Sequence, residues 1–312
     1  MTGGSAPRND APATPLVVLA AGRGSRYGGV KPLAPVGLAG EAVIDVLGSD
    51  AIAAGFSPLV LVIGPDTGPA VRYHVARRWP SDVDVRFAVQ EAPRGTVDAV
   101  LAATDELEPG ASFGVANADD LPGVDALALL ARHLGGEDPA HAAVCFRLRD
   151  SLLGTAPVTR GLCEVGDDGL LRAVDERRHV TPMPDGRIEA HDGREPVELD
   201  PTQPVSVNLW GFRPPIRAIL RAAMQGASGD AEVLLPDLVD GLLAGRVRAA
   251  PETAAPRAGT APRVRVLFAP GRVIGVTHAE DVALVQAELA RDVGRGERPA
   301  QLWATRPAGW PA

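Results

Sequence analysis

Short apolar runs alternate regularly with longer segments of helical spacing, and this alternation restricts the fold more than any other feature of the sequence. Apolar runs typical of buried strands stand at 16–21, 57–64, 83–90, 112–120 and 141–148. Segments of helical spacing stand at 41–56, 96–107 and 123–134, the second with Thr96 as its expected N-cap. The pattern predicts an α/β fold with a doubly wound, mostly parallel sheet of the Rossmann-like kind.

After residue 150 the alternation gives way to patterns typical of antiparallel strands. Residues 160–176 predict a hairpin that turns at 167–169, and residues 205–212 predict a further strand. A last segment of helical spacing covers 280–293, and the chain has no internal repeat. The sequence therefore predicts a mixed sheet with antiparallel additions in its second half.

One domain over residues 15–303 accounts for all of these elements. A disordered leader is expected at 1–14 and a loose tail at 304–312, because both are rich in small residues and proline. A loose loop of similar composition is expected at about 248–263.

Charge and composition narrow the class of protein. The net charge of −8 argues against a general nucleic-acid binder, which would carry a basic face. No apolar run reaches the roughly 18 residues of a membrane helix. The two cysteines, Cys145 and Cys163, cannot build a disulfide framework, and the six histidines show no ligand spacing. We therefore expect a cytoplasmic protein with reduced thiols and with no nucleic-acid or membrane partner.

A glycine-rich segment, LAAGRGSRYGGVKPL at 19–33, directly follows the first predicted strand. It contains Lys31, the only lysine of a chain whose other basic side chains are all arginine. Ligands of open α/β sheets bind at the carboxyl ends of the strands, where this segment lies. Gly22 and Gly24 let backbone N–H groups approach an anion, and Arg26 and Lys31 add positive charge.

Two common phosphate-binding motifs do not fit this segment. A dinucleotide-binding fingerprint needs a third glycine at position 27, which is Tyr27, and a P-loop needs a Gly-Lys-Ser/Thr ending that the segment lacks. A plain glycine-rich turn with incidental charges remains an alternative.

The order of motifs along the chain resembles the sugar-1-phosphate nucleotidylyltransferases, the NDP-sugar pyrophosphorylases. Lys31-Pro32 closes a segment similar to the family's signature, and Gln90 followed by Gly95-Thr96 is similar to its base-reading segment. Further motifs follow in the order of a bacterial subgroup resembling UTP–glucose-1-phosphate uridylyltransferases, at 116–120, 160–165, 174–177, 205–212 and 274–281. The resemblance covers residues 15 to 303 and implies a nucleotidyltransferase fold.

The resemblance also implies a reaction. An NTP, with UTP or dTTP favoured, would be joined to a sugar 1-phosphate by in-line attack on the α-phosphorus, giving an NDP-sugar and pyrophosphate. Such an enzyme aligns two anions and stabilises their charge. Arg26 would hold the pyrophosphate in bidentate fashion, Lys31 would lie beside the reacting phosphates, and Asp119 would hold Mg²⁺.

The remaining implied contacts fall into three groups. Nucleotide binding is implied for Leu19, Ala20, Ala21, Gly22, Arg23, Gly24, Gln90, Gly95 and Thr96. Contacts with the sugar phosphate are implied for Asn117, Glu176, Arg177 and Asn208. Thr277 falls where many relatives carry an aspartate or asparagine as the second metal ligand, and Arg177 stands where many carry a lysine.

Most of these residues also have a plainer interpretation. Asp119 and Asp120 are acidic residues of the kind that often cap a following helix, and Gln90 is of a type common on surfaces. Glu176 belongs to a charged cluster at 175–178, and Asn208 could make a hydrogen bond within the core. A buried amide without a partner is costly, however, which favours a ligand contact for Asn208.

Other functions stay open on the sequence alone. The same chemistry could act on a cyclitol phosphate or a phosphonate. A glycosyltransferase of similar fold would use NDP-sugars, but it typically centres on Asp-x-Asp, whereas this chain has Asn117-Ala-Asp119-Asp120. A non-catalytic sensor of sugar nucleotides is a third alternative. The oligomeric state is open, a homo-oligomer included.

Overall fold

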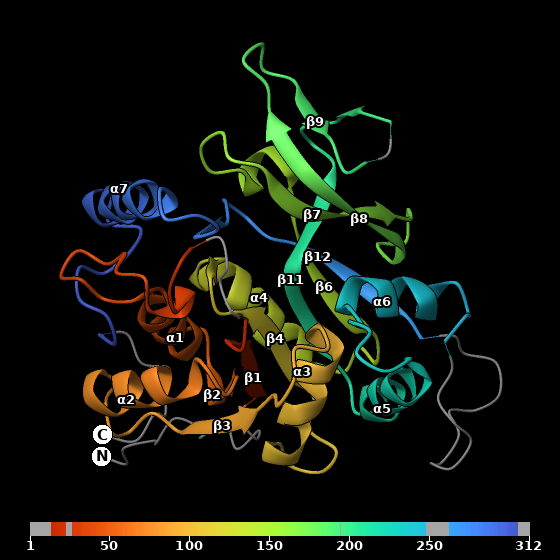
Figure 1. Cartoon of the computed structure of the whole chain (residues 1–312), viewed down its shortest axis with the longest axis horizontal. Coiled ribbons are helices and arrows are strands. Elements are labelled where there is room, and N and C mark those ends of the chain that lie inside the picture. The colour runs from red at the N-terminus through yellow and green to blue at the C-terminus, as the bar shows by residue number, and fades with distance from the viewer. Residues whose placement is uncertain (1–13, 23–26, 194, 248–261, 305–312) are drawn as a thin grey trace, which may run out of the picture.

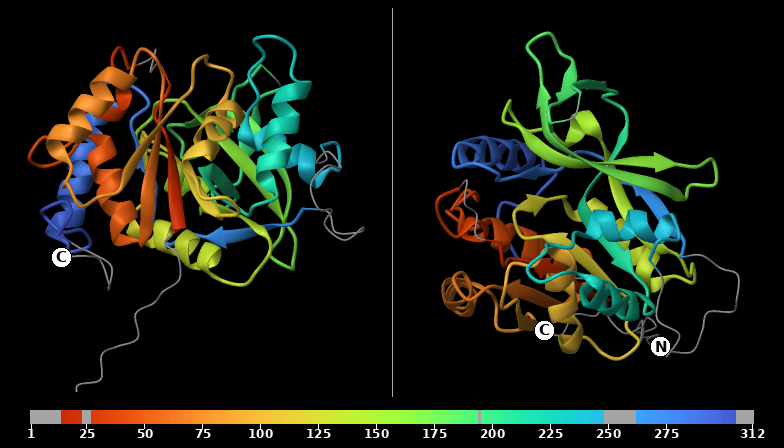
Figure 2. Two further views of the ribbon diagram at one scale, coloured as in Figure 1. Left: turned by 90° about the horizontal axis from the view of Figure 1, so that it is seen from below. Right: turned by 45° about the vertical axis from the view of Figure 1, so that its right-hand side comes forward.

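A single large sheet runs through the molecule, with helices on both of its faces (Figures 1 and 2). The computed structural model describes residues 14–22, 27–193, 195–247 and 262–304. Within these residues, eleven strands form the large sheet and two short strands form a second one. The predicted α/β fold with a mixed, doubly wound sheet is confirmed.

The first half of the chain forms the parallel part of the sheet. Its strands are β1 (Thr14–Leu19), β2 (Phe56–Ile63), β3 (Val85–Val89) and β4 (Phe113–Asn117). Their order in space is β3-β2-β1-β4. Strand β1 therefore lies between β2 and β4, and the strand order changes direction there. Ligands bind at such a switch point, at the carboxyl ends of the strands.

The helices are divided between the two faces of the sheet. One core contains side chains of α1 (Val43–Ala53), α2 (Gly68–Arg78), α4 (Val124–Gly135) and α7 (Asp281–Gly294). The other contains side chains of α3 (Thr96–Ala103), α5 (Ile216–Gly226) and α6 (Leu235–Leu243). Alternate side chains of β1 enter opposite cores, Leu16 and Val18 in one and Val17 in the other. Because both faces of the strand are buried, its sequence is a continuous apolar run.

Antiparallel strands extend the sheet beyond β4. They are β7 (Val158–Val165), β8 (Leu171–Pro182), β9 (Ile188–Ala190), β10 (Val197–Leu199) and β11 (Pro204–Phe212). Strand β11 pairs with β4, β6 (His141–Arg147) and β7, and β12 (Val264–Phe268) pairs with β6. Figure 1 shows β11 running from the parallel strands to β7, β8 and β9. Strand β11 thus joins the two parts of the sheet.

Short elements complete the fold. The second sheet pairs β5 (Asp120–Leu121) with β13 (Ile274–Gly275). Short 3-10 helices cover Lys31–Leu33, Thr104–Glu106 and Leu148–Ser151. The hairpin between β7 and β8 turns as expected, with Gly169 at a φ of 72°.

Two local expectations are wrong. Thr14 is not part of a leader, because it pairs with Phe56 as the first residue of β1. Thr96 does not cap α3: Gly95 is the N-cap residue, and the Thr96 hydroxyl oxygen accepts a hydrogen bond from the Leu235 N–H at 2.8 Å. The leader at 1–13, most of the expected loop at 248–261 and the tail at 305–312 lie outside the described residues.

Candidate active site

Lys31 and Asp119 meet at the carboxyl ends of β1 and β4. These strands are parallel neighbours with Leu19 opposite Asn117, so the segments that follow them leave the same edge of the sheet. The Lys31 ammonium lies 2.5 Å from Asp119 Oδ2. Both side chains are partly exposed, Lys31 at 20% and Asp119 at 27%, and are therefore accessible to a ligand. Two residues far apart in sequence thus form one charged centre.

Asp120 lies beneath this centre and is half-buried. Burial and the neighbouring charge of Asp119 raise its pKa to about 6, while Arg160 and a hydrogen bond from Asn117 act in the opposite direction. The Asn117 amide donates this bond to Asp120 Oδ2 at 3.0 Å. The pair of adjacent carboxylates makes the site strongly attractive to a cation.

Thr277 belongs to a segment that packs against the two aspartates. Strand β13 pairs Gly275 with Asp120, and the Val276 N–H donates to the Asp119 carbonyl oxygen at 3.0 Å. The backbone of β13 can come this close to Asp120 only with glycine at 275, because a Cβ there would lie 2.5 Å from Asp120 Oδ1. The Thr277 N–H donates to Asp281 Oδ2 at 2.7 Å. Thr277 therefore lies on the segment next to the two aspartates, and its role as a metal ligand stays a prediction.

The donor set suits Mg²⁺ better than a metal that needs a cage of protein ligands. Within the described ranges no group of three or more His, Cys, Asp or Glu side chains could hold a metal ion. Mg²⁺ is commonly held by one or two carboxylates together with phosphate oxygens and water. The Asp119–Asp120 pair offers the one or two carboxylates that such a site uses.

Arg160 is a site residue that the sequence analysis did not single out. Its guanidinium donates to the Ser151 hydroxyl at 3.0 Å, to the Ser151 carbonyl at 2.5 Å and to the Thr159 carbonyl at 2.8 Å. Its charge acts on both Asp119 and Asp120, and with Asp120 and Thr277 it lines a cavity of about 10 Å³, room for one water molecule. Its position at the start of the 160–165 motif was the available signal.

A line of neighbouring residues on four adjacent strands leads from Asn117 to Glu176. The Asn117 amide also donates to the Val207 carbonyl oxygen on β11 at 3.4 Å, and the adjacent Ser206 pairs with Gly161 on β7. Gly161 in turn pairs with Glu176 on β8. Three strand spacings of about 4.8 Å each therefore separate Asn117 from Glu176. Asn208, one residue beyond Val207, lies next to this line.

Glu176 and its neighbour Arg177 have different surroundings. Burial and the charge of Asp237 on α6 raise the pKa of Glu176, which Arg178 opposes. Arg177 is buried, and its Nε donates to Asp192 Oδ2 at 2.5 Å while its Nη2 lies 3.3 Å from Asp192 Oδ1. Breaking this buried ion pair would leave an uncompensated charge. The Arg177 guanidinium is thus bound within the protein, whereas the Glu176 side chain stays partly exposed, at 19%.

Gln90, Gly95 and Thr96 form a compact unit after β3. The Gln90 amide nitrogen donates to the Gly95 carbonyl and to Asp98 Oδ2, both at 3.0 Å. Gly95 has a φ of 90°, and a Cβ there would lie 2.4 Å from the Val233 carbonyl oxygen. Glycine at 95 is therefore required by the backbone angle and by the close approach of Val233.

The glycine-rich segment is described only in part. Ala20 continues β1, with its N–H bonded to the Val62 carbonyl at 2.8 Å, and Leu19 accepts from the Ala118 N–H at 3.1 Å. Ala21 is half-buried and Gly22 is exposed at the edge of the sheet. The predicted contacts of Arg23, Gly24 and Arg26 fall on residues outside the described ranges.

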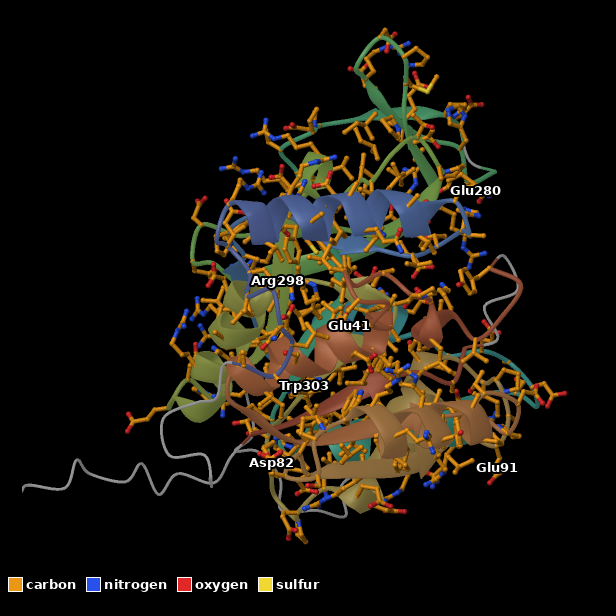
Figure 3. All side chains as sticks on the ribbon, turned by 90° about the vertical axis from the view of Figure 1, so that its left-hand side faces the viewer. Glu41, Asp82, Glu91, Glu280, Arg298 and Trp303 are labelled. Carbon is orange, nitrogen blue, oxygen red and sulfur yellow. The ribbon has the colours of Figure 1, made fainter. Side chains whose placement is uncertain are left out.

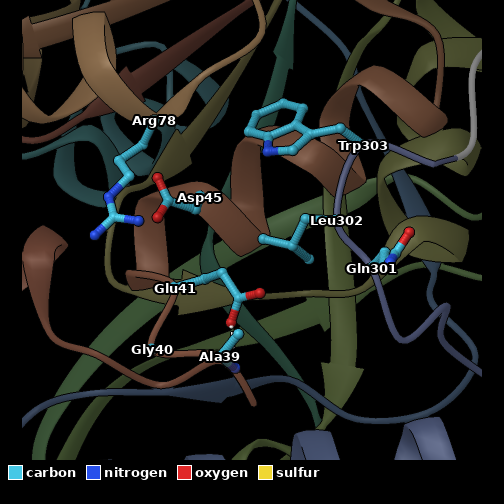
Figure 4. A pocket seen from close by; sticks show the side chains of 8 residues that line it. All are labelled: Ala39, Gly40, Glu41, Asp45, Arg78, Gln301, Leu302 and Trp303. Carbon is cyan, nitrogen blue, oxygen red and sulfur yellow. Dashed lines mark hydrogen bonds between the residues drawn. The ribbon is translucent and has the colours of Figure 1, made fainter.

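A separate cavity of about 330 Å³ lies against α1, away from these residues. Figure 4 shows Glu41, Asp45 and Arg78 on one side and residues 301–303 on the other. Arg298 binds Asp50 at 2.6 Å and Trp303 packs on Trp79 with ring centroids 5.0 Å apart, so the C-terminal segment is anchored there (Figure 3). Since Glu41 and Asp45 already accept backbone N–H groups, we do not assign this cavity to the active site.

Comparison with known proteins supplies the class of reaction. Residues 16–234, which include Lys31, Asp119, Glu176 and Asn208, match the family model of the MobA-like NTP transferase domain. The search of curated proteins gives no match. In the described parts of the chain, no helix has both the length and the apolar character needed to cross a membrane.

Proposed function

The chain belongs to the MobA-like NTP transferase family and is a nucleotidyltransferase, and we propose that it joins an NTP to a sugar 1-phosphate. The products would be an NDP-sugar and pyrophosphate. The single observation that carries this proposal is the contact of Lys31 with Asp119 at the edge from which a line of neighbouring residues on adjacent strands leads to Glu176. One end of this line suits phosphates and a metal ion, and the other suits hydroxyl groups.

The charged centre would serve the phosphates. Lys31 would exchange Asp119 for a phosphate oxygen when the nucleotide binds, because an ammonium is a compact charge that can follow a moving oxygen. Asp119, with Asp120 behind it, would hold Mg²⁺, which supplies charge stabilisation for the phosphorus and its leaving group. Arg160 would keep the two carboxylates oriented and charged. Arg26 would bind the departing pyrophosphate.

The other end would orient the second substrate, the molecule that receives the nucleotidyl group. Asn117, Asn208 and Glu176 would bind its hydroxyl and phosphate oxygens. Arg177 has no part in this proposal, because its guanidinium is bound to Asp192. Alignment of the attacking oxygen with the α-phosphorus is the main work that these contacts do.

The nucleotide base would lie near Gln90. Since both N–H groups of its amide are used by Gly95 and Asp98, only the amide oxygen remains to receive a hydrogen bond. The N3–H of uracil or thymine is a suitable donor to that oxygen. An accepting oxygen at this point is compatible with UTP and dTTP, the nucleotides that the resemblance implies.

The test is pyrophosphate release measured over a matrix of nucleotides and second substrates with Mg²⁺. UTP, dTTP, CTP, ATP and GTP would be combined with glucose, galactose, mannose and N-acetylglucosamine 1-phosphates, an inositol phosphate and 2-aminoethylphosphonate. We expect turnover with a sugar 1-phosphate and UTP or dTTP. Turnover restricted to the inositol phosphate or the phosphonate would keep the chemistry but contradict the proposed substrate class.

A further inference from the structure

Strand β11 is irregular at Asn208. It pairs with β6 through Ser206 opposite Cys145 and again through Trp210 opposite Ala143, so four steps along β11 match two along β6. Asn208 lies inside this bulge with a φ of 62°. Left-handed backbone is costly for residues other than glycine, and asparagine is among those that tolerate it best. Such strain is concentrated at binding sites.

The Asn208 side chain is held by Trp210. The indole Nε1–H donates to Asn208 Oδ1 at 3.1 Å, and the Asn208 N–H donates to the Ser206 hydroxyl at 3.2 Å. Trp210 is completely buried and stacks on Phe212 with ring centroids 6.4 Å apart. An indole nitrogen can only donate, so the amide must turn its oxygen toward the ring and its nitrogen away from it.

The amide nitrogen of Asn208 has no partner among the described residues. Asn208 is only half-buried, and its Nδ2 is neither hydrogen-bonded to the protein nor enclosed. The adjacent Val207 carbonyl is bound by Asn117, which also binds Asp120. The two N–H groups of the Asn208 side chain thus have a direction fixed by Trp210, and Asn208 follows directly on the residue that Asn117 contacts.

We propose that Trp210 is a positioning residue that holds the Asn208 amide with its NH₂ group toward the second substrate. The site thereby selects a substrate with an oxygen at that point, either a hydroxyl or a phosphate oxygen. This inference rests on the proposed function for the identity of the second substrate, but the orientation of the amide is a property of the protein alone.

Three asparagines in the chain make the orientation measurable. Labelling with ¹⁵N-asparagine gives side-chain NH₂ signals only for Asn9, Asn117 and Asn208, and Asn208→Asp identifies one of them by its loss. We expect the Asn208 signals of the wild-type protein to lie away from the positions of a free amide. In Trp210→Phe, which removes the indole N–H but keeps an aromatic ring, they should move to those positions. Unchanged Asn208 signals in a folded Trp210→Phe protein would overturn the proposal.

A double-mutant cycle tests the consequence for the substrate. With UTP, Mg²⁺ and glucose 1-phosphate, Trp210→Phe should raise the KM for glucose 1-phosphate about tenfold and leave the KM for UTP unchanged. Asn208→Asp keeps an oxygen for the indole and tolerates the backbone angle, but it has no N–H donors and should raise the same KM at least as much. Adding Trp210→Phe to Asn208→Asp should then have no further effect on that KM.

Phe212→Leu is the matched control, since it loosens the same aromatic stack without touching the amide. It should lower the melting temperature but leave the KM for glucose 1-phosphate unchanged. A Trp210→Phe effect that is equal in the wild-type and Asn208→Asp backgrounds would show that Trp210 acts only on packing. If the wild-type protein uses no sugar 1-phosphate, the proposed function fails, and the NMR measurement alone decides the inference.

Discussion

The parallel and antiparallel parts of the sheet position their residues of the proposed active site in different ways. In the parallel part, Lys31 and Asp119 lie on segments that follow β1 and β4, beyond the regular strands. In the antiparallel part, Glu176 and Asn208 project from within β8 and β11, and β11 is distorted to do so. One part uses the ends of regular strands, whereas the other uses residues inside strands, of which Asn208 lies at a bulge.

This difference affects how each part would respond to mutation. Segments at strand ends can change without disturbing the core, so substitutions there should act on catalysis with little loss of stability. Groups within strands share hydrogen bonds with buried neighbours such as Trp210, so substitutions there should change binding and stability together. Mutations in the two parts therefore test this contrast.

Removal of the Asp119 carboxylate should abolish activity without unfolding the protein. We expect Asp119→Ala to lower pyrophosphate release by about a thousandfold or more, because the reacting phosphorus loses its cation. Circular dichroism on the same sample should match that of the wild type. Asp125→Ala, which removes an exposed carboxylate from the first turn of α4, is the control and should remain active. A folded, active Asp119→Ala protein would remove Asp119 from the site.

One buried histidine of the antiparallel part, His141, should make the stability of the protein fall at low pH. Burial, with further contributions from the charges of Arg213 and His133, lowers the pKa of His141 on β6 to about 4. Its Nδ1 accepts the Arg213 backbone N–H at 3.0 Å, which requires the neutral ring. Between pH 6.5 and 4 the unfolded chain binds a proton that the folded one does not, so the free energy of unfolding should fall by about 3 kcal/mol as the pH is lowered.

Urea unfolding of wild type and His141→Gln at pH 7.5 and pH 4 isolates this contribution. Asp50, Asp120 and Glu176 have raised pKa values, which act in the opposite direction, but they are present in both proteins and cancel in the difference. The wild type should lose more stability than the variant. Equal losses would show that His141 titrates normally in the folded protein.

The single lysine should not be replaceable by arginine. Lys31→Arg keeps the charge, but a planar guanidinium cannot occupy the position of the ammonium 2.5 Å from Asp119 and follow the phosphate. We expect kcat to fall by roughly a hundredfold with little change in stability. Because no other side-chain amine exists, amine-directed labelling after blocking the N-terminus reports on Lys31 alone. UTP with Mg²⁺ should protect it, and equal labelling with and without nucleotide would count against the assignment.

The smallest effect is expected at Gln90, the residue proposed to contact the nucleotide base. Gln90→Ala removes the oxygen offered to the N3–H of uracil or thymine and should reduce the preference for UTP over ATP by about tenfold, or 1.4 kcal/mol. Steady-state kinetics with one accepted sugar phosphate measures this ratio. Arg86→Ala, on β3 but bonded to the Glu106 carbonyl, serves as a control whose nucleotide preference should not change. A preference of the wild type for ATP or GTP would contradict this interpretation of Gln90.

The sequence was most informative where the chemistry depends on strand ends. Alternating apolar runs predicted the parallel strands, and parallel strands necessarily bring their carboxyl ends to one edge, which is why Lys31 and Asp119 could be expected to lie together. The N-cap role of Thr96 was wrong because Leu235, from a distant segment, binds its hydroxyl. Local propensity cannot anticipate such a partner.

What the sequence by itself determined is the alternation, the sheet type and the charged residues available at the edge. Tertiary structure alone decided that Arg177 is buried against Asp192, that Arg160 faces the two aspartates, and that Trp210 directs the Asn208 amide. The physical reason is that strand periodicity and motif spacing are local, whereas the direction of a side chain in an antiparallel strand depends on register. A bulge of two residues in β11 changes that register, and no local pattern records it.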